Sequence, residues 1–410
     1  MRERSNILSV VQRHIERVLD KNWWQCFKDY RYRANKEWNL GYILEVLLAG
    51  ALSGCKTLRE VETLSEVYAD RVSDTTLHDM MIQLDPQGLR AELAKGVKQA
   101  LREHELPKDE FPVRITAIDG KYNFNTDRVV NEYSEPIGGG GNNEQYRHIA
   151  LRAMHVSSET KLYLGQHEIE SKGSETNELI EFVDELQALY GRTGLLEVIS
   201  VDAGIVSKKN ARELIDRGLN YILAIKGCQP KLFAAAQGMF SEVNADCVTE
   251  EVYNGNLVTR RLTRMLSPAI ENWGHIQEFW KIETSITSRD GNQISQEVRY
   301  YITSLAASTL TNKQVLAAIR MHWGIENNAN WCFDVLWNED TAPWTSRAMV
   351  LVAHLRMMAY NIIQRLKTRR LKSQNNRALG WKDLFRFFEH ALCSLRKTTE
   401  IGGTATPAFL

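Results

Sequence analysis

The sequence predicts an α/β protein in which helices flank a mixed sheet, and three observations support that class. Residues 1–106 follow a helical period, whereas the residues from 111 onward alternate strand-like and helix-like runs. Two aspartates, Asp119 in ITAIDGK and Asp202 in VISVDAG, each follow a short, apolar, β-branched run. Because active sites in such sheets lie at the strand ends, we expect the two carboxylates to meet there.

The composition argues against a membrane protein and is neutral about charged partners. The chain has 410 residues, 43% of them hydrophobic and 25% charged, which suits two to four domains. Its longest apolar run, residues 40–52, contains Glu45 and is shorter than the ~20 residues that span a bilayer. With 51 basic and 51 acidic residues, the chain must hold any nucleic acid by local patches.

Two further patterns concern location and redox state. The first 20 residues alternate charged and apolar positions without an uninterrupted apolar block, which argues against a secretory signal. A cytoplasmic location is therefore expected. The six cysteines form no CxxC pair and have no histidine at zinc-ligand spacing, so we expect reduced, mostly buried thiols.

Residues 1–110 are predicted to form an all-helical N-terminal domain. One apolar stripe runs through residues 7–19, and residues 40–52 form a second, buried helix. Residues 57–84 indicate two helices joined by a short turn, with Ser73 as the N-cap of the second. Either a DNA-reading helix-turn-helix or an ordinary helical hairpin fits this segment.

Residues 111–228 are predicted to hold three strands, a helix, a strand, a helix and a strand. The strand-like runs are 113–118, 146–156, 161–169, 195–201 and 220–226, and the helical runs are 174–191 and 207–218. Ser174 is expected to cap the first of these helices. The segment from Gly120 to Arg147 is too long for a tight hairpin, and its glycines at 138–141 indicate a mobile loop.

Residues 229–297 alternate polar and β-favouring positions and carry NG and DG turn signals, which predicts a β-rich insertion. The domain that begins at residue 111 is then expected to resume over residues 298–366. Within it, Thr311 or Asn312 can cap a helix that carries Glu326 beside an inward apolar stripe. The stripe consists of Ala318, Ile325, Ala329, Cys332 and Leu336. A basic helical C-terminal segment is predicted to follow, and it covers residues 367–410.

Three carboxylates carry the predicted chemistry. Asp119, Asp202 and Glu326 offer only oxygen ligands, which suit hard divalent cations, whereas histidine or thiolate ligands would favour zinc. Two Mg²⁺ ions about 3.5–4 Å apart can activate the attacking oxygen and stabilise the leaving oxygen when a phosphodiester is cut. The sequence therefore predicts a metal-dependent phosphoryl-transfer enzyme.

Several longer segments carry a family resemblance. In chain order they are AIDGK, YLGQHEIESKGSETNEL, VISVDAG, YILAIKGCQPKL, EVRYYITSL and RMHWGIENNANWCFDVLWNED. Over roughly residues 35–366 the chain resembles the DDE transposases of bacterial insertion sequences, specifically the H-repeat-associated, IS-As-type group. The resemblance implies an RNase H-like fold, two Mg²⁺ or Mn²⁺ ions per active site, and cleavage and joining of transposon ends. It also implies that Asp119, Asp202 and Glu326 are the catalytic residues and metal ligands.

Seven further residues are candidate DNA contacts, and they are Lys121, Lys226, Arg320, His322, Asn330, Arg369 and Arg370. The two lysines follow strands close to the aspartates, and Arg320 corresponds to a basic position that the family keeps ahead of its glutamate. His322 and Asn330 lie within one turn of Glu326 and could instead order metal-bound water. The last two arginines belong to the basic run RLKTRRLK, which could also be a solvated face.

The chain departs from the family pattern beside Glu326. NNANW stands where relatives tend to have asparagine, any residue, leucine, histidine and tryptophan. The insertion also lacks the family's histidine-glycine-arginine run. These departures concern DNA contacts and leave the three carboxylates untouched.

The resemblance also implies the partners. They are double-stranded DNA, as transposon ends and target, and further copies of the chain, because two ends must be joined together. The helical domain of residues 1–110 is expected to bind the ends. In a bacterial cell the protein would be cytoplasmic and associated with the nucleoid while bound to DNA. Two alternatives stay open: a domesticated, non-catalytic DNA-binding regulator, and a structure-selective nuclease that hydrolyses DNA without joining it. A regulator need not bind Mg²⁺, and a nuclease would give no strand transfer.

Overall fold

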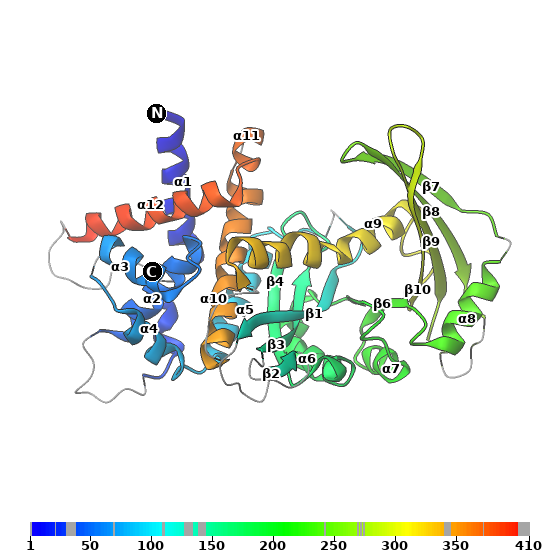
Figure 1. The fold of residues 1–410 in the computed structure, drawn as a ribbon, viewed down its shortest axis with the longest axis horizontal. Coiled ribbons are helices and arrows are strands. Elements are labelled where there is room, and N and C mark those ends of the chain that lie inside the picture. Colours follow the sequence, from blue (N-terminus) through cyan, green and yellow to red (C-terminus); the bar gives the residue numbers. More distant parts are fainter. Residues whose placement is uncertain are drawn as a thin grey trace.

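One mixed sheet of ten strands, with helices on both faces, is the centre of the described structure (Figure 1). The computed structural model describes residues 2–20, 22–29, 38–68, 70–108, 111–126, 134–137, 145–241, 243–268, 270, 273, 275–339, 346–371 and 373–400. Within these ranges no helix is long and apolar enough to cross a membrane.

The sheet has the predicted RNase H-like core. Its strands are β1 (Ile115–Thr126), β2 (Ser134–Ile137), β3 (Gln145–His155), β4 (Leu162–Ile169), β5 (Val198–Val201), β6 (Asn220–Ile225), β7 (Cys247–Tyr253), β8 (Asn256–Leu266), β9 (Glu278–Thr287) and β10 (Gln293–Thr303). They are ordered β2-β3-β1-β5-β6-β10-β9-β8-β7, and β4 also pairs with β3. The core order is therefore β4-β3-β1-β5-β6, in which β3 is antiparallel to β1 and β4, whereas β1, β5 and β6 are parallel. This arrangement confirms the predicted fold class.

The helices form three groups along the chain. The N-terminal group is α1 (Arg2–Val18), α2 (Leu40–Leu52), α3 (Leu58–Tyr68), α4 (Asp74–Met81) and α5 (Gln87–Arg102). The central group is α6 (Glu175–Tyr190), α7 (Lys208–Asp216), α8 (Pro230–Met239) and α9 (Asn312–His322), followed by the π-helical turns η5 (Ile325–Asn330) and η6 (Cys332–Leu336). The C-terminal group is α10 (Ser346–Arg365), the π-helical η8 (Leu366–Arg370), α11 (Gln374–Arg377) and α12 (Trp381–Glu400).

Successive side chains of β1 point to opposite faces of the sheet. Ala117 belongs to the apolar core that includes α9 and α10, and Ile118 belongs to the core that includes α6 and α7. Figure 1 shows α9 on one side of the sheet and α6 and α7 on the other. Asp119 therefore faces the α9 side, and Gly120 faces the α6 side.

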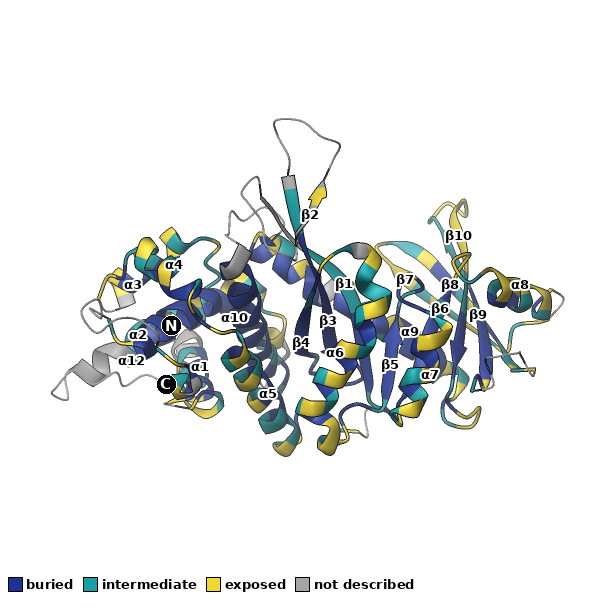
Figure 2. Ribbon diagram, turned by 90° about the horizontal axis from the view of Figure 1, so that it is seen from below, coloured by how far each residue is buried: buried dark blue, intermediate teal, exposed yellow. Residues whose placement is uncertain are grey.

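Two predicted domain boundaries cut through continuous structure. The β-rich insertion ends, at residue 297, inside β10, and β10 pairs with β6, so its strands extend the central sheet. The N-terminal helices share one apolar core with α10 and α12, so the C-terminal segment is not separate from them. Figure 2 shows this continuity as buried residues that run through α10, β3 and β4. Contacts between distant parts of the chain leave no local sequence signal. This explains why the predicted boundaries near residues 297 and 367 differ from the packing that the structure shows.

Local signals mostly predict the observed helix ends. Ser73 caps α4, and Thr311 caps α9 in a reciprocal capping box, as predicted. Ser174 precedes α6, but its hydroxyl pairs with that of Ser171 at 3.1 Å, so that predicted cap is wrong. The helical hairpin of α3 and α4 packs on α2. The glycine tract at 138–141 lies outside the described residues.

Candidate active site

Asp119 and Asp202 lie side by side because of strand register. β1 pairs with β5 in parallel up to Ile118 and Val201, and the next two residues in that register are the aspartates. The expectation that Asp119 ends its strand is wrong, because β1 continues to Thr126 in an antiparallel pair with β3. The strand that ends at the site is β5, and its departure from the sheet opens space beside β1.

Glu326 reaches the aspartates from the segment that follows α9. The helix changes there to π-helical hydrogen bonding, and η5 packs against β1. Ile325 and Ala329 are buried, as predicted for the inward stripe, whereas Glu326 is exposed. Wide π-helical turns occur often at functional sites, since they shift one side chain relative to the regular helical period. The three predicted catalytic residues therefore meet at one place.

Burial and neighbouring carboxylates raise the pKa values of Asp119 and Glu326. Burial raises the pKa of Asp119 to about 7, and the charges of Glu326 and Asp202 raise it in the same direction. Desolvation on the side that faces the sheet raises the pKa of Glu326, and the charge of Asp202 adds to it. Lys226 and Arg299 oppose that shift. A cation between the carboxylates would relieve the same repulsion, and the all-oxygen donor set fits a hard dication.

A separate trio of potential metal ligands lies away from these carboxylates. Among the described residues, only His167, Glu178 and Glu181 have ligand atoms that all lie within 4.8 Å of one another. Asp119, Asp202 and Glu326 do not meet that criterion in this structure. The trio lies instead between β4 and α6, where His167 stacks on Phe182 in the other core.

The two candidate lysines have different surroundings. Lys226 Nζ lies 3.5 Å from Asp202 Oδ2, and 56% of its side chain is exposed, so it is available to a phosphate beside the site. Lys121 Nζ pairs with Asp334 Oδ1 at 2.5 Å, and only 11% of its side chain is exposed. Lys121 therefore ties β1 to η6, and the predicted DNA contact does not fit its position.

His322 and Asn330 are buried, which contradicts their predicted DNA contacts. The Nδ1 atom of His322 hydrogen-bonds Ser200 Oγ at 3.1 Å on β5, and burial lowers the pKa of His322 to about 4. Asn330 lies between Asp119 and Tyr163 and hydrogen-bonds both. Both side chains lie on the inner face of their helical turns, so they support the site from within the protein.

Arg320 faces the extended sheet and not the carboxylates. Its guanidinium pairs with Glu251 of β7 at 3.0 Å, and Arg260 of β8 pairs with the same carboxylate side chain at 2.7 Å. The pair connects α9 to the far strands of the sheet. A DNA contact by Arg320 stays a prediction.

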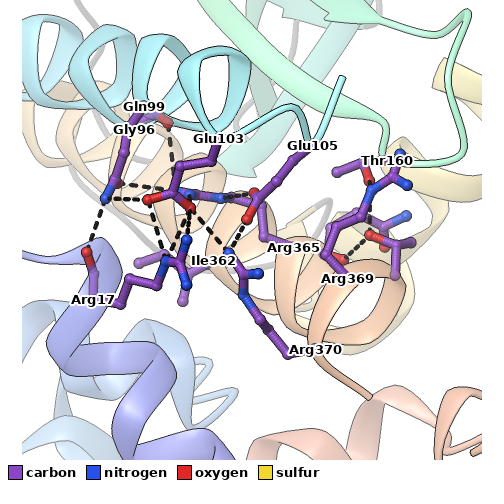
Figure 3. A network of polar contacts seen from close by, with 12 residues as sticks. Arg17, Gly96, Gln99, Glu103, Glu105, Thr160, Ile362, Arg365, Arg369 and Arg370 are labelled. Atoms are coloured by element: carbon purple, nitrogen blue, oxygen red, sulfur yellow. Dashed lines mark hydrogen bonds and ion pairs between the residues drawn. The ribbon is translucent and has the colours of Figure 1, made fainter. Parts of the chain in front are cut away.

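Arg369 and Arg370 are part of a polar network inside the protein (Figure 3). Arg370 pairs with Glu103 at 2.9 Å and also with Glu105, both just past α5. Arg369 donates to Thr160 Oγ1 at 2.6 Å. Arg365, Arg369 and Arg370 therefore pair with carboxylates that are far away in the sequence, which argues against a free basic face at these three positions.

Arg299 is a functional candidate that the sequence did not single out. It lies on β10, and its guanidinium stacks over the Trp323 ring at 3.9 Å from the ring centre. Its charge lowers the pKa of Glu326, so it lies close enough to act on the site. Arginine within an alternating strand is an ordinary exposed residue by pattern, which is why only the fold reveals it.

Acidic residues beyond Glu326 hold its segment in place. Asp334 pairs with Lys121 of β1, and Glu339 accepts two hydrogen bonds of 2.9 Å from Arg152 of β3. Both members of the second pair are fully buried. The segment from Asp334 to Glu339 therefore anchors η5 and η6 to the sheet through ion pairs.

An RNase H-like sheet with three carboxylates gathered where β5 ends defines a class of metal-dependent enzymes that transfer phosphoryl groups of nucleic acids. The family model described as the transposase DDE domain matches residues 111–362. This match covers more than half of the chain, which therefore belongs to the DDE transposase family.

Related proteins carry transposase names. The chain is 27% identical over 226 residues to YncI of Escherichia coli O157:H7, named a transposase, and the match covers 52% of this chain and 55% of YncI. It is 24% identical over 361 residues to YhhI of Escherichia coli K12, named an H repeat-associated transposase, covering 82% of this chain and 87% of YhhI. Against a cryo-EM structure of the piggyBac transposase synaptic complex with hairpin DNA, the TM-score is 0.45 at 13% identity, over 98% of this chain and 80% of that one.

Proposed function

We propose that this chain cuts and rejoins the ends of an insertion sequence with two divalent ions held by Asp119, Asp202 and Glu326. The observation that supports this most is that burial and neighbouring carboxylates raise the pKa values of both Asp119 and Glu326, as at a site that would be relieved by a cation. Oxygen-only donors favour Mg²⁺ or Mn²⁺ over zinc. The proposed substrate is double-stranded DNA, as transposon ends and target.

The chain's own residues would position the reacting groups. When bound, the ions would supply activation of the attacking oxygen and stabilisation of the leaving oxygen. β1 and β5 hold two carboxylates in register, and η5 brings Glu326 to them. Lys226 and Arg299 are the basic side chains closest to this chemistry, and we assign them to phosphates that flank the cut. Joining two ends calls for at least two copies of the chain on DNA.

Conservative changes to the carboxylates test the proposal. Asp119→Asn and Glu326→Gln are each expected to abolish Mg²⁺-dependent cleavage of a labelled duplex that carries the element's terminal sequence. Each variant removes a charged metal ligand and keeps the shape, so folding and end binding should be retained. Asp216→Asn, which changes an exposed carboxylate of α7 on the other side of the sheet, is the matched control and should cleave like the parent. Mg²⁺-dependent cleavage by Asp119→Asn at the parental rate would contradict the proposal.

The same duplex separates the alternatives. A cleaved end that joins a second duplex supports a transposase, whereas cleavage without any joined product supports a nuclease. A parent protein that binds the ends but gives no calorimetric signal with Mn²⁺ supports a regulator. A joined product, a cleaved product without joining, and the absence of Mn²⁺ binding are three different results. Experiments on one preparation can therefore distinguish a transposase, a nuclease and a regulator.

A further inference from the structure

A buried chain of hydrogen bonds leads from Asp119 into the protein. Asn330 Nδ2 donates to Asp119 Oδ2 at 3.4 Å, and Tyr163 Oη donates to Asn330 Oδ1 at 3.0 Å. All of the Tyr163 side chain and nearly all of Asn330 are removed from solvent.

The chemistry of the groups fixes the direction of this chain. An ionised Asp119 can only accept, so it must face the NH₂ group of Asn330. The amide oxygen of Asn330 then faces Tyr163, and the tyrosine hydroxyl must donate. Burial keeps the pKa of Tyr163 well above its usual value, so the hydroxyl retains its proton at neutral pH. Reversing the amide would place two acceptors against each other at Asp119.

The structure also holds Tyr163 rigidly. Asn361 of α10 accepts from the Tyr163 backbone N–H at 2.8 Å and donates to its carbonyl at 2.9 Å. The ring packs edge-on against Phe333 and Tyr360, with ring centres 5.2 Å away in each case. A ring held on both faces has one place for its hydroxyl, so the position of the Asn330 amide is set by α10 and β4 together.

We infer that Tyr163 is a positioning residue for the metal centre, acting through Asn330. The amide of Asn330 binds one oxygen of Asp119 and leaves the other oxygen for a divalent ion. This inference rests on the proposed function, in which Asp119 is a metal ligand. Groups that orient metal ligands in this way typically change metal affinity about 10–100-fold when they are removed.

The test is the Mn²⁺ affinity of the full chain, measured by titration calorimetry without DNA. Tyr163→Phe removes one hydroxyl and keeps the ring, and it is expected to weaken Mn²⁺ binding by about tenfold. Asn330→Leu removes the whole amide at similar volume and is expected to weaken binding at least as much. If Tyr163 acts only through Asn330, the double variant will be no weaker than Asn330→Leu alone.

Tyr190→Phe is the matched control. Tyr190 is also fully buried, and its hydroxyl donates to Leu164 O at 2.8 Å, on the strand residue next to Tyr163 but in the other core. It should lose stability by a similar amount, measured by urea unfolding, and keep the parental Mn²⁺ affinity. Equal loss of Mn²⁺ affinity in Tyr190→Phe and Tyr163→Phe would mean that the hydroxyl acts only through general stability, and the inference would be overturned.

Asp119→Asn distinguishes failure of the inference from failure of the proposed function. If this variant loses Mn²⁺ binding and Tyr163→Phe and Asn330→Leu do not, the metal site stands and the positioning role is wrong. If Asp119→Asn keeps full Mn²⁺ affinity, the assignment of the metal site itself is wrong. A Tyr163→Phe variant that does not fold leaves Asn330→Leu to decide between these results.

Discussion

Asp119 is the residue whose environment best explains the site. On the α9 side of β1 its carboxylate meets Asn330, Asp202 and Glu326, and burial raises its pKa to about 7. On the α6 side, the next residue in the strand has no side chain at all. The carboxylate of Glu175 occupies that space, since a Cβ on Gly120 would lie 2.0 Å from Glu175 Oε1. The flexible end of Glu175 therefore fills the space that a side chain at residue 120 would enter.

Gly120→Ala is expected to lower the free energy of unfolding by only about 0.5–1.5 kcal/mol, because the new methyl group forces the flexible end of Glu175 to turn away. Urea unfolding measures this loss. Gly96→Ala is the control: it lies inside α5 with no atom within 4 Å of the added Cβ, so it should be neutral or stabilising. The double variant Gly120→Ala/Glu175→Ala should recover most of the loss, and failure to recover it would place the strain elsewhere.

At the scale of elements, the π-helical segment after α9 is fixed to the sheet by ion pairs with two strands. Glu326 is exposed at the start of η5, and the next turns are tied to β1 by Lys121 and to β3 by Arg152. The exposed carboxylate of Glu326 is thus carried by a segment with one fully buried anchor and one largely buried anchor. The position of Glu326 depends on those anchors and not on its own contacts.

Glu339→Gln is expected to destabilise the protein by about 3–5 kcal/mol, because it leaves the buried charge of Arg152 without its partner. Asp216→Asn, which removes an exposed pair with Arg212 on α7, should change the unfolding free energy very little. Chemical denaturation compares the two. Similar values for both variants would show that burial of the Arg152 pair adds nothing to its importance.

At the scale of the whole molecule, the two ends of the described chain belong to one body. α1 and α12 pack together, and both share a core with α2 and α10. The network around Arg365 and Arg370 joins η8 to the end of α5 (Figure 3). The basic run after α10 therefore serves as a connection between helices.

Arg370→Ala is expected to lower the unfolding free energy by about 1–3 kcal/mol, since Glu103 and Glu105 lose a charged hydrogen-bond donor. The slope of log DNA affinity against log salt concentration should stay at the parental value, because no phosphate contact is lost. Arg386→Ala, at an exposed position of α12, should leave stability unchanged. Unchanged stability together with a flatter salt slope in Arg370→Ala would instead support a DNA contact.

Much of the fold and the centre of the site could be predicted from the sequence. The order of strands and helices from β1 to β6 follows from local periodicity, and the position of Asp202 just past the end of β5 follows from its apolar run. Glu326 was found by its family pattern and by an apolar stripe whose five members are all buried. These features depend on neighbours within a few turns or residues, so the sequence contains them.

Only the tertiary structure showed which polar side chains make contacts within the protein and which are exposed to solvent. Lys121, Arg369 and Arg370 are basic like DNA contacts, yet each forms an ion pair with a carboxylate that is distant in sequence. Conversely, Tyr163 and Arg299 gain their importance only beside Asn330 and Glu326. Charge pairing and burial depend on which elements pack together, whereas periodicity depends only on the chain itself. The sequence by itself therefore determined the family and the three carboxylates, and packing decided what surrounds them.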